Sequence, residues 1–223
     1  RSPPRTGGSP HPAPSPTPLR FPQPKTVSPW TSIRMRLFTA FDPSDQLRDA
    51  LSDVRSWTGD IPLSVRWSDP DQYHCTLRFI GEVGSAEAAA LRSALREVDS
   101  PGFRAEPHGL TALPGRRNPR VLVLSLDLSS PLRHLYRAVT SALQDEGIDP
   151  ENRSYRPHIT LGRLNDPDRE VVHRFLKRHR EASFPAFPVS GFQLYESTLT
   201  PDGAVHEIVE SYDLTPPPGG ETG

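Results

Sequence analysis

The sequence predicts an α+β protein with two pseudo-symmetric lobes, each an antiparallel-rich sheet with two helices on its outer face. Strand-like and helix-like segments alternate from Met35 onwards, and this order is repeated once, about 85 residues further along the chain. Each copy contains the same short motif, His-x-Thr-Leu, at residues 74–77 and 158–161. We expect the two motif strands to face each other across a central cleft.

The elements of the first copy follow from hydrophobic spacing and turn residues. An apolar strand is predicted at 35–41, and Ser44 is a typical N-cap for the helix after it. A second strand is predicted at 73–80, followed by a helix that begins at Ser85 and a weaker strand at 103–113. One apolar stripe per helix is expected, formed by Leu47, Leu51 and Val54 in the first and by Ala88, Leu91, Leu95 and Val98 in the second.

The second copy shows the same order. An apolar run at 120–128 is followed by a helix with Pro131 at its first position, which is expected to end at Gly147. Its apolar stripe is formed by Leu132, Leu135, Val139 and Leu143. The remaining elements are predicted to be a strand at 159–164, a helix starting at 166–167, and two strands near 189–196 and 206–214 joined by a turn at 201–203.

A direct alignment supports the duplication. At an offset of 85 residues, 36–51 aligns with 121–136, and at an offset of 84 the two His-x-Thr-Leu motifs coincide. The matched pairs in the first alignment are Leu37/Leu122, Asp42/Asp127, Ser44/Ser129, Leu47/Leu132 and Arg48/Arg133. We therefore predict one domain over 35–214 with intertwined lobes, built from repeat units at about 35–119 and 120–214.

The motifs have the composition of an acid–base site. Side chains two positions apart share one face of a strand. The predicted site face carries His74, Thr76 and Arg78 from the first copy and Arg156, His158 and Thr160 from the second, whereas Cys75 faces the core. Imidazoles exchange protons near neutral pH, and hydroxyl and guanidinium groups bind phosphate oxygens. This set predicts a phosphodiester substrate, with one imidazole as general base and the other as general acid.

The sequence lacks the motifs that are typical of several other catalytic mechanisms. There is no P-loop, no Gly-x-Ser-x-Gly turn and no His-Glu-x-x-His helix, and no carboxylates closely flank either motif. Cys75 is the only cysteine, which excludes an intramolecular disulfide and a cysteine-based zinc site. We expect catalysis without metal, cofactor or covalent intermediate, which requires a reactive linkage such as a strained 2',3'-cyclic phosphate.

Composition bounds the surroundings and partners of the domain. Residues 1–34 contain five basic and no acidic side chains and 10 of the 27 prolines, and so are predicted to be a disordered extension. Either they are a genuine tail, or the natural start is Met35. The remaining chain has 21 basic and 27 acidic residues, a net charge of −6, which suits an RNA end or a small nucleotide better than a long duplex.

No segment has the length and apolarity of a membrane span or a signal peptide, so we expect a cytoplasmic protein without membrane contact. We expect a monomer without an obligate protein partner. A flexible tail is predicted at 215–223.

The motifs resemble those of a known family. The segments around them, 74–83 and 156–163, are similar to the paired motifs of the two-histidine phosphoesterase superfamily. More closely, they resemble the bacterial RNA 2',3'-cyclic phosphodiesterases, also called 2'-5' RNA ligase-like proteins. The segments 35–41 and 194–197 also resemble that family, and the resemblance covers about 35–214.

The resemblance implies hydrolysis of a 2',3'-cyclic phosphodiester to a 2'-phosphomonoester. By this analogy His74 donates a proton to the departing 3' oxygen, His158 accepts one from water, and Thr76 and Thr160 hold phosphate oxygens. Arg163 and Phe79 match positions that approach the nucleotide. Strict alternation places both on the opposite face from the histidines, so this role requires a local bulge or strand end.

Two alternatives remain at the level of the sequence. The same residues could form a non-catalytic module that binds a 2'-phosphorylated nucleotide or RNA end, and 2'-5' ligation is the reverse of the hydrolytic reaction. Two intact histidines favour the enzyme, because a binding module does not require two proton-transfer groups.

Overall fold

A computed structural model describes residues 34–59, 61–115, 117–200 and 203–217. The predicted N-terminal extension lies outside these residues, apart from Arg34. Thr215, which we placed in a flexible tail, instead exchanges backbone hydrogen bonds with Ser100 and Gly102, at 3.0 and 2.7 Å. Among the described residues, no helix has the length and apolar character needed to cross a membrane.

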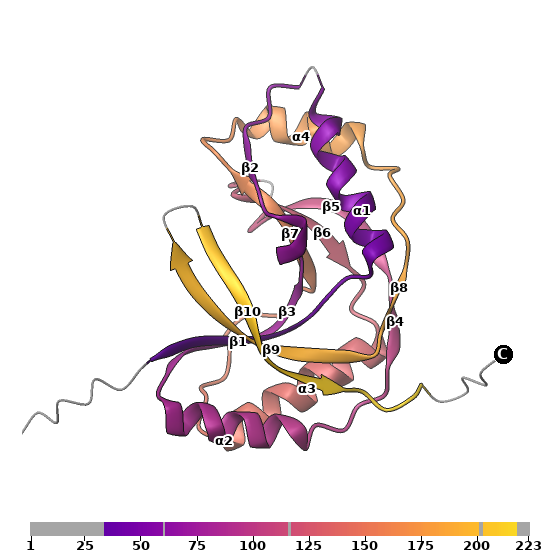
Figure 1. Ribbon diagram of the computed structural model, residues 1–223. Coiled ribbons are helices and arrows are strands. Elements are labelled where there is room, and N and C mark those ends of the chain that lie inside the picture. The colour runs from indigo at the N-terminus through magenta and orange to yellow at the C-terminus, as the bar shows by residue number, and fades with distance from the viewer. Residues whose placement is uncertain (1–33, 60, 116, 201–202, 218–223) are drawn as a thin grey trace, which may run out of the picture. The chain divides into compact units, whose positions relative to one another are not determined.

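The observed elements follow the predicted order, with boundaries that differ by a few residues (Figure 1). The short strand β2 and the two 3-10 turns were not predicted. The segments predicted as single strands at 103–113 and near 189–196 are each divided into two strands. The strands are β1 (Met35–Phe41), β2 (Val65–Trp67), β3 (Cys75–Val83), β4 (Phe103–Ala105), β5 (Pro107–Leu113), β6 (Val121–Leu126), β7 (His158–Leu164), β8 (Phe187–Val189), β9 (Gly191–Thr200) and β10 (Gly203–Asp213). The helices are α1 (Asp45–Asp53), α2 (Ser85–Arg96), α3 (Ser130–Asp145) and α4 (Arg169–Arg178), with 3-10 turns η1 (Val54–Thr58) and η2 (Pro70–Gln72).

The strand order shows the duplication in three dimensions. Eight strands form one sheet in the order β10-β9-β1-β3-β7-β6-β5, with β2 also paired to β7. The strands of the two repeats correspond as β1 to β6, β3 to β7 and β5 to β9. When each of these strands is replaced by its counterpart, the same central order results, read from the opposite end of the sheet. We call β10, β9, β1 and β3 half A, and β7, β6, β5 and β2 half B. Each half takes two of its strands from the other repeat, β9 and β10 in half A and β2 and β5 in half B.

The predicted separation of the motif strands is wrong. We expected β3 and β7 to face each other across a gap, but they are hydrogen-bonded neighbours, with Cys75 opposite Ile159. They pair at this single position because β7 then continues beside β2 instead, from Trp67 opposite Gly162 to Val65 opposite Leu164. The two halves are therefore joined edge to edge at the centre of one antiparallel sheet.

The helices lie in two pairs, again taken from both repeats. Figure 1 shows α2 and α3 together beside half A, where α2 packs on α3 and α3 contacts β3. At the other end of the molecule α1 and α4 lie near half B, where α4 contacts β5. Because α1 follows a strand of half A and α3 follows a strand of half B, the chain crosses between the halves in each repeat.

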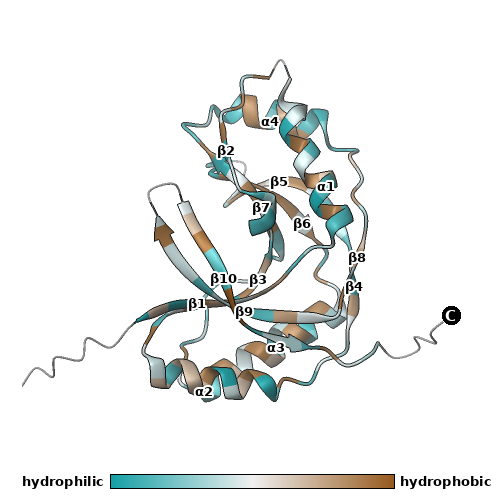
Figure 2. Cartoon of the chain, viewed as in Figure 1, coloured by the Kyte–Doolittle hydropathy of each residue, from teal (hydrophilic) through white to brown (hydrophobic). Residues whose placement is uncertain are grey.

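The equivalent helices α1 and α3 begin in the same way. The hydroxyls of Ser44 and Ser129 accept the backbone N–H groups of Leu47 and Leu132, each at 3.4 Å. This confirms the predicted N-cap at Ser44. Helix α3 begins at Ser130, so Pro131 is its second residue and not, as we predicted, its first. The apolar stripe of α3 is buried at all four predicted positions. In Figure 2 the helices show apolar and polar residues on different sides, as expected for helices that cover one face of a sheet.

The sheet has an apolar cluster on each face. The large one lies between the sheet and the helices and contains Cys75, Leu77, Ile159 and Leu161, which confirms that Cys75 faces the core. A small cluster of Phe38, Ala40 and Tyr195 is separate from it. The side chains on the same face as this small cluster are the ones available for function.

The contact between β2 and β7 depends on a glycine. A Cβ atom at Gly162 would lie 2.6 Å from Cγ1 of Val65 and 2.8 Å from the carbonyl oxygen of Arg66. These distances are shorter than a van der Waals contact, and one of the atoms belongs to the backbone. Any side chain at position 162 therefore pushes β2 away from β7.

We predict that Gly162→Ala lowers the free energy of unfolding by about 1–3 kcal/mol, the usual cost of overpacking. Urea unfolding followed by circular dichroism measures this. Gly115→Ala is the control, because a Cβ at position 115 meets no atom within 4 Å. Equal stability of the two variants would contradict the account of β2.

Candidate active site

The single pairing of β3 with β7 defines the site. Residues directly opposite each other in an antiparallel pair point to the same face, and the side chains on either side of them point to the other. Since Cys75 and Ile159 are both fully buried in the core, the flanking side chains lie together on the opposite face. This site face carries the two histidines and two threonines of the motifs, namely His74, Thr76, His158 and Thr160. Antiparallel pairing also sets each histidine near the threonine of the other motif.

Both imidazoles are held in the same way. Nδ1 of His74 lies 2.9 Å from the carbonyl oxygen of Gln72, and Nδ1 of His158 lies 2.7 Å from the carbonyl oxygen of Arg156. A carbonyl can only accept, so each Nδ1 carries a hydrogen and donates it. In the neutral ring Nε2 is then the basic nitrogen, and in the charged ring it is a donor. The two histidines can thus play opposite roles at Nε2 with the same ring orientation.

A bulge in each motif strand changes which residues share the site face. On β3 the register moves from Ala40 opposite Thr76 to Thr39 opposite Arg78, which leaves Leu77 without a partner. The alternation of side chains therefore reverses after the motif. Phe79 lies on the site face, 57% exposed, with its ring centroid 5.9 Å from that of Phe38.

The second motif has the equivalent bulge. On β7 the register moves from Val123 opposite Thr160 to Leu122 opposite Gly162, which leaves Leu161 without a partner. Arg163, the counterpart of Phe79 at an offset of 84 residues, is exposed on the site face as a result. These two bulges are the local irregularities that the resemblance required.

Because of the bulge in β3, the predicted orientation of Arg78 is wrong. We expected Arg78 to share a face with His74, but its side chain is 3% exposed on the opposite face. Nη1 of Arg78 lies 2.8 Å from Oε1 of Glu151, and Nη2 donates to the carbonyl oxygen of Asp149. Arg78 therefore fastens the segment before β7 to β3 and is not available to a substrate. Arg156 is exposed and lies near the carbonyl oxygen of Pro114, at 3.5 Å.

Aromatic rings surround His74, which sequence reasoning did not anticipate. The centroid of Phe38 lies 5.0 Å from that of His74, and His206 meets His74 edge to face at 5.1 Å. Tyr195 stacks on Phe38 at 5.1 Å. No pattern in the sequence connects position 206 to position 74, because their contact depends on the pairing of four strands.

Burial changes the proton affinity of these rings. It lowers the pKa of His74, while the hydrogen bond to Gln72 opposes this and a positive charge on His158 adds to it. Burial, followed by the charge of His74, lowers the pKa of His206 to about 4. Nδ1 of His206 is buried without a hydrogen-bond partner. His206 is therefore neutral near pH 7.

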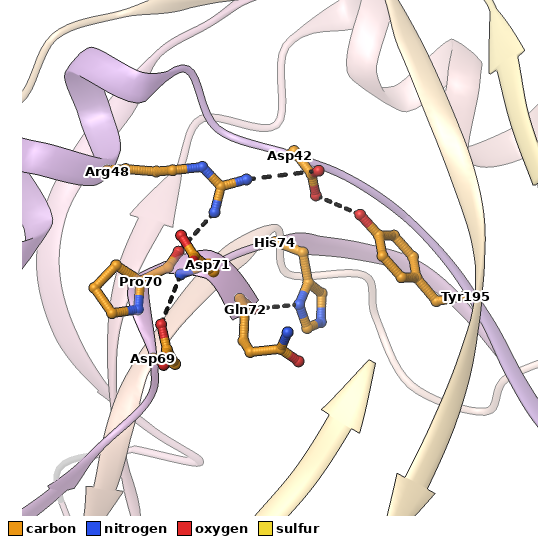
Figure 3. A network of polar contacts seen from close by, with 8 residues as sticks. All are labelled: Asp42, Arg48, Asp69, Pro70, Asp71, Gln72, His74 and Tyr195. Carbon is orange, nitrogen blue, oxygen red and sulfur yellow. Dashed lines mark hydrogen bonds and ion pairs between the residues drawn. The ribbon is translucent and has the colours of Figure 1, made fainter. Parts of the chain in front are cut away.

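A polar network supports the turn that precedes His74 (Figure 3). The hydroxyl of Tyr195 donates to Oδ1 of Asp42 at 2.7 Å, and Arg48 lies 3.5 Å from the other oxygen of that carboxylate. Arg48 also donates to the carbonyl oxygen of Pro70 at 2.6 Å. The network thus connects β9, the start of α1 and η2.

Gln72 completes the support of His74. Its backbone carbonyl accepts from His74, and its side-chain oxygen accepts the backbone N–H of His206 at 2.8 Å. The residue therefore fixes His74 relative to β10. His158 has the equivalent carbonyl contact, but no aromatic contact with its ring is recorded among the described residues.

The arrangement suits phosphate chemistry without further groups. Two imidazoles with basic Nε2 atoms, two hydroxyls and the exposed Arg163 gather on one face, and each type is a common partner of phosphate oxygens. Within the described ranges, no group of three or more His, Cys, Asp or Glu side chains is arranged to hold a metal ion. A duplicated fold with one such histidine in each repeat defines the class of two-histidine phosphoesterases.

Comparisons with known proteins agree with this class. The chain belongs to the LigT-like phosphoesterase family, whose model matches it twice, at residues 41–123 and 126–206. The two matches begin 85 residues apart, which is the offset of the internal repeat.

Curated relatives and solved structures give the same result. The chain is 28% identical to the RNA 2',3'-cyclic phosphodiesterase of Aquifex aeolicus, over 81% of this chain and 97% of that protein. It is 30% identical to the protein of the same name from Aeropyrum pernix, over 74% and 90%. The crystal structure of TT0787 of Thermus thermophilus matches with a TM-score of 0.64 and 26% identity, over 82% and 99%. E. coli LigT in apo form has the same fold, with a TM-score of 0.64 and 24% identity, over 82% and 98%.

We predict that stability falls as the pH is lowered from 6.5 towards 4. The folded state disfavours a proton on His206, whose pKa falls from 6.5 to about 4, whereas the unfolded chain binds that proton below pH 6.5. His74 acts in the same direction. Urea unfolding at several pH values should show a shallower decline for His206→Phe than for the wild type. An unchanged slope would contradict the burial of a neutral His206, and His134→Ala, an exposed change on α3, is the control.

Proposed function

We propose that the protein hydrolyses the 2',3'-cyclic phosphate of RNA ends or small nucleotides to a 2'-phosphomonoester, without a metal ion. The observation that carries this proposal is the matched pair of imidazoles. Each has Nδ1 held by the carbonyl two residues before it, and each has Nε2 available on the same face. The names of the curated relatives support the substrate class.

In the proposed reaction the oxygen of water forms a bond to phosphorus while the bond from phosphorus to the 3' oxygen breaks. Nε2 of His158 takes a proton from the water, and Nε2 of His74 gives a proton to the 3' oxygen. Thr76 and Thr160 donate hydroxyl hydrogens to the non-bridging oxygens. One histidine ends protonated and the other neutral, and exchange with solvent restores the starting state.

The burial of His74 affects how it would act as the general acid. Burial lowers its pKa, so in the free protein the ring holds its proton weakly. A bound phosphate anion next to the ring favours the charged imidazolium and raises that pKa. Binding of the anionic substrate therefore promotes the protonation state that the acid requires, and a weakly held proton is readily transferred to the leaving oxygen.

The two bulges suggest how the nucleotide is placed. Phe79 presents an exposed ring on half A, and Arg163 presents a guanidinium at the equivalent position of half B. We infer that Phe79 lies beside the base and that Arg163 approaches the nucleotide from the other side of the phosphate site. Arg156 contributes through its carbonyl, which orients His158.

We predict that His74→Ala and His158→Ala each lower the rate of 2',3'-cyclic nucleotide hydrolysis by about 10² to 10⁴, the usual contribution of one general acid or base. The assay is run in EDTA, where the wild type should remain active. His134→Ala, on the exposed side of α3, should match the wild type.

Two results would reject the proposal. Unchanged turnover in either site variant would remove that histidine from the reaction, and loss of wild-type activity in EDTA would indicate a metal ion. Binding of the 2'-phosphorylated product without any turnover of the cyclic substrate would instead support a non-catalytic binding module.

A further inference from the structure

Half B carries a second arginine on the site face, opposite Arg163. Arg66 of β2 and Arg163 of β7 are register partners in an antiparallel pair, so their side chains leave the sheet on the same side. Arg163 is also opposite Val121 on its other edge. Both arginines are exposed. Three adjacent strands therefore hold two guanidinium groups next to each other, beyond the threonine of the second motif.

Among the described residues, neither guanidinium group of this pair is neutralised by a carboxylate, as some arginines of the domain are. Arg48 lies beside Asp42, Arg78 beside Glu151, and Arg92 beside Glu210. In the part of the chain that the structure describes, no ion pair involves Arg66 or Arg163. Like charges directly opposite each other on neighbouring strands destabilise a sheet. An anion bound between the two guanidinium groups removes that repulsion and accepts hydrogen bonds from both.

The position of the pair fits a phosphate other than the one being cleaved. Arg163 follows Thr160 by three residues, at most about 10 Å of extended chain, so the pair lies within one nucleotide of the threonine that is proposed to hold the cyclic phosphate. Gly162 makes this possible, since β2 approaches β7 closely only where no side chain intervenes.

The two halves carry different types of side chain on the site face beyond the motif residues. At the corresponding place on half A, the site face includes a group of rings, those of Phe38, Phe79, Tyr195 and His206. Aromatic faces suit a base, whereas paired guanidinium groups suit a phosphate. The net charge of −6 over residues 35–223 argues against a long basic track, so the site is suited to one additional phosphate.

We propose that Arg66 and Arg163 bind the internucleotide phosphate adjacent to the cyclic end, which makes the end of an RNA chain a better substrate than a free cyclic mononucleotide. This inference rests on the proposed hydrolysis of 2',3'-cyclic phosphates. It assigns Arg66 to substrate binding and names the feature that distinguishes the two substrate classes.

The test compares kcat/KM for two substrates with the same 3'-terminal nucleoside 2',3'-cyclic phosphate, a dinucleotide and the mononucleotide. Because guanidinium–phosphate contacts are charge-assisted, we expect Arg66→Gln to lower kcat/KM for the dinucleotide about tenfold, mainly through KM. For the mononucleotide we expect a change of less than about threefold. Arg174→Gln, an exposed arginine on α4, is the control for loss of one positive charge and should change neither value.

A dinucleotide with an uncharged methylphosphonate linkage provides the second arm. Removing the charge from the substrate should reduce kcat/KM as Arg66→Gln does, and combining the two changes should give little further loss, because they remove the same contact. Equal kcat/KM for the two substrates in the wild type, or equal loss on both in Arg66→Gln, would overturn this inference alone. Hydrolysis of neither substrate by the wild type would instead reject the proposed function.

Discussion

The pairing of Cys75 with Ile159 is the constraint on which the site depends. It joins the two repeats at the centre of one sheet, and its antiparallel direction places each histidine across from the threonine of the other motif. Both partners are buried, so the core fixes the orientation of the flanking side chains. The pair of imidazoles is thus a consequence of the duplication and of the way in which its two copies meet.

The two halves are similar next to the β3–β7 pairing and differ in the strands further from it. Near the pairing, the two motifs share the same carbonyl contact, the same threonine and the same bulge. One strand away, Phe38 and Tyr195 of half A have Val123 and Thr111 as counterparts in half B. Only half B contains β2 and its arginine. The shared geometry supplies the proposed proton transfers, and the different surroundings separate the proposed base side from the proposed side of the adjacent phosphate.

Local signals in the sequence predicted most of the elements but not all of the site. The N-cap at Ser44 and the stripe of α3 depend on neighbours within a few residues, so spacing was enough to find them. The reversal at Leu77 and Leu161 depends on how β1 and β6 pair with the motif strands, and therefore Arg78 was placed on the wrong face. His206 reaches His74 through β10, β9 and β1, and no short-range pattern encodes such a contact.

The central claim is that the two imidazoles divide the proton transfers, and the pH dependence of kcat/KM for the single variants tests it most directly. In His74→Ala only the base remains, so residual activity should rise with pH. In His158→Ala only the acid remains, so residual activity should fall as His74 loses its proton. The same pH dependence in both variants would contradict the division of roles, and the two dependences exchanged would reverse the assignment.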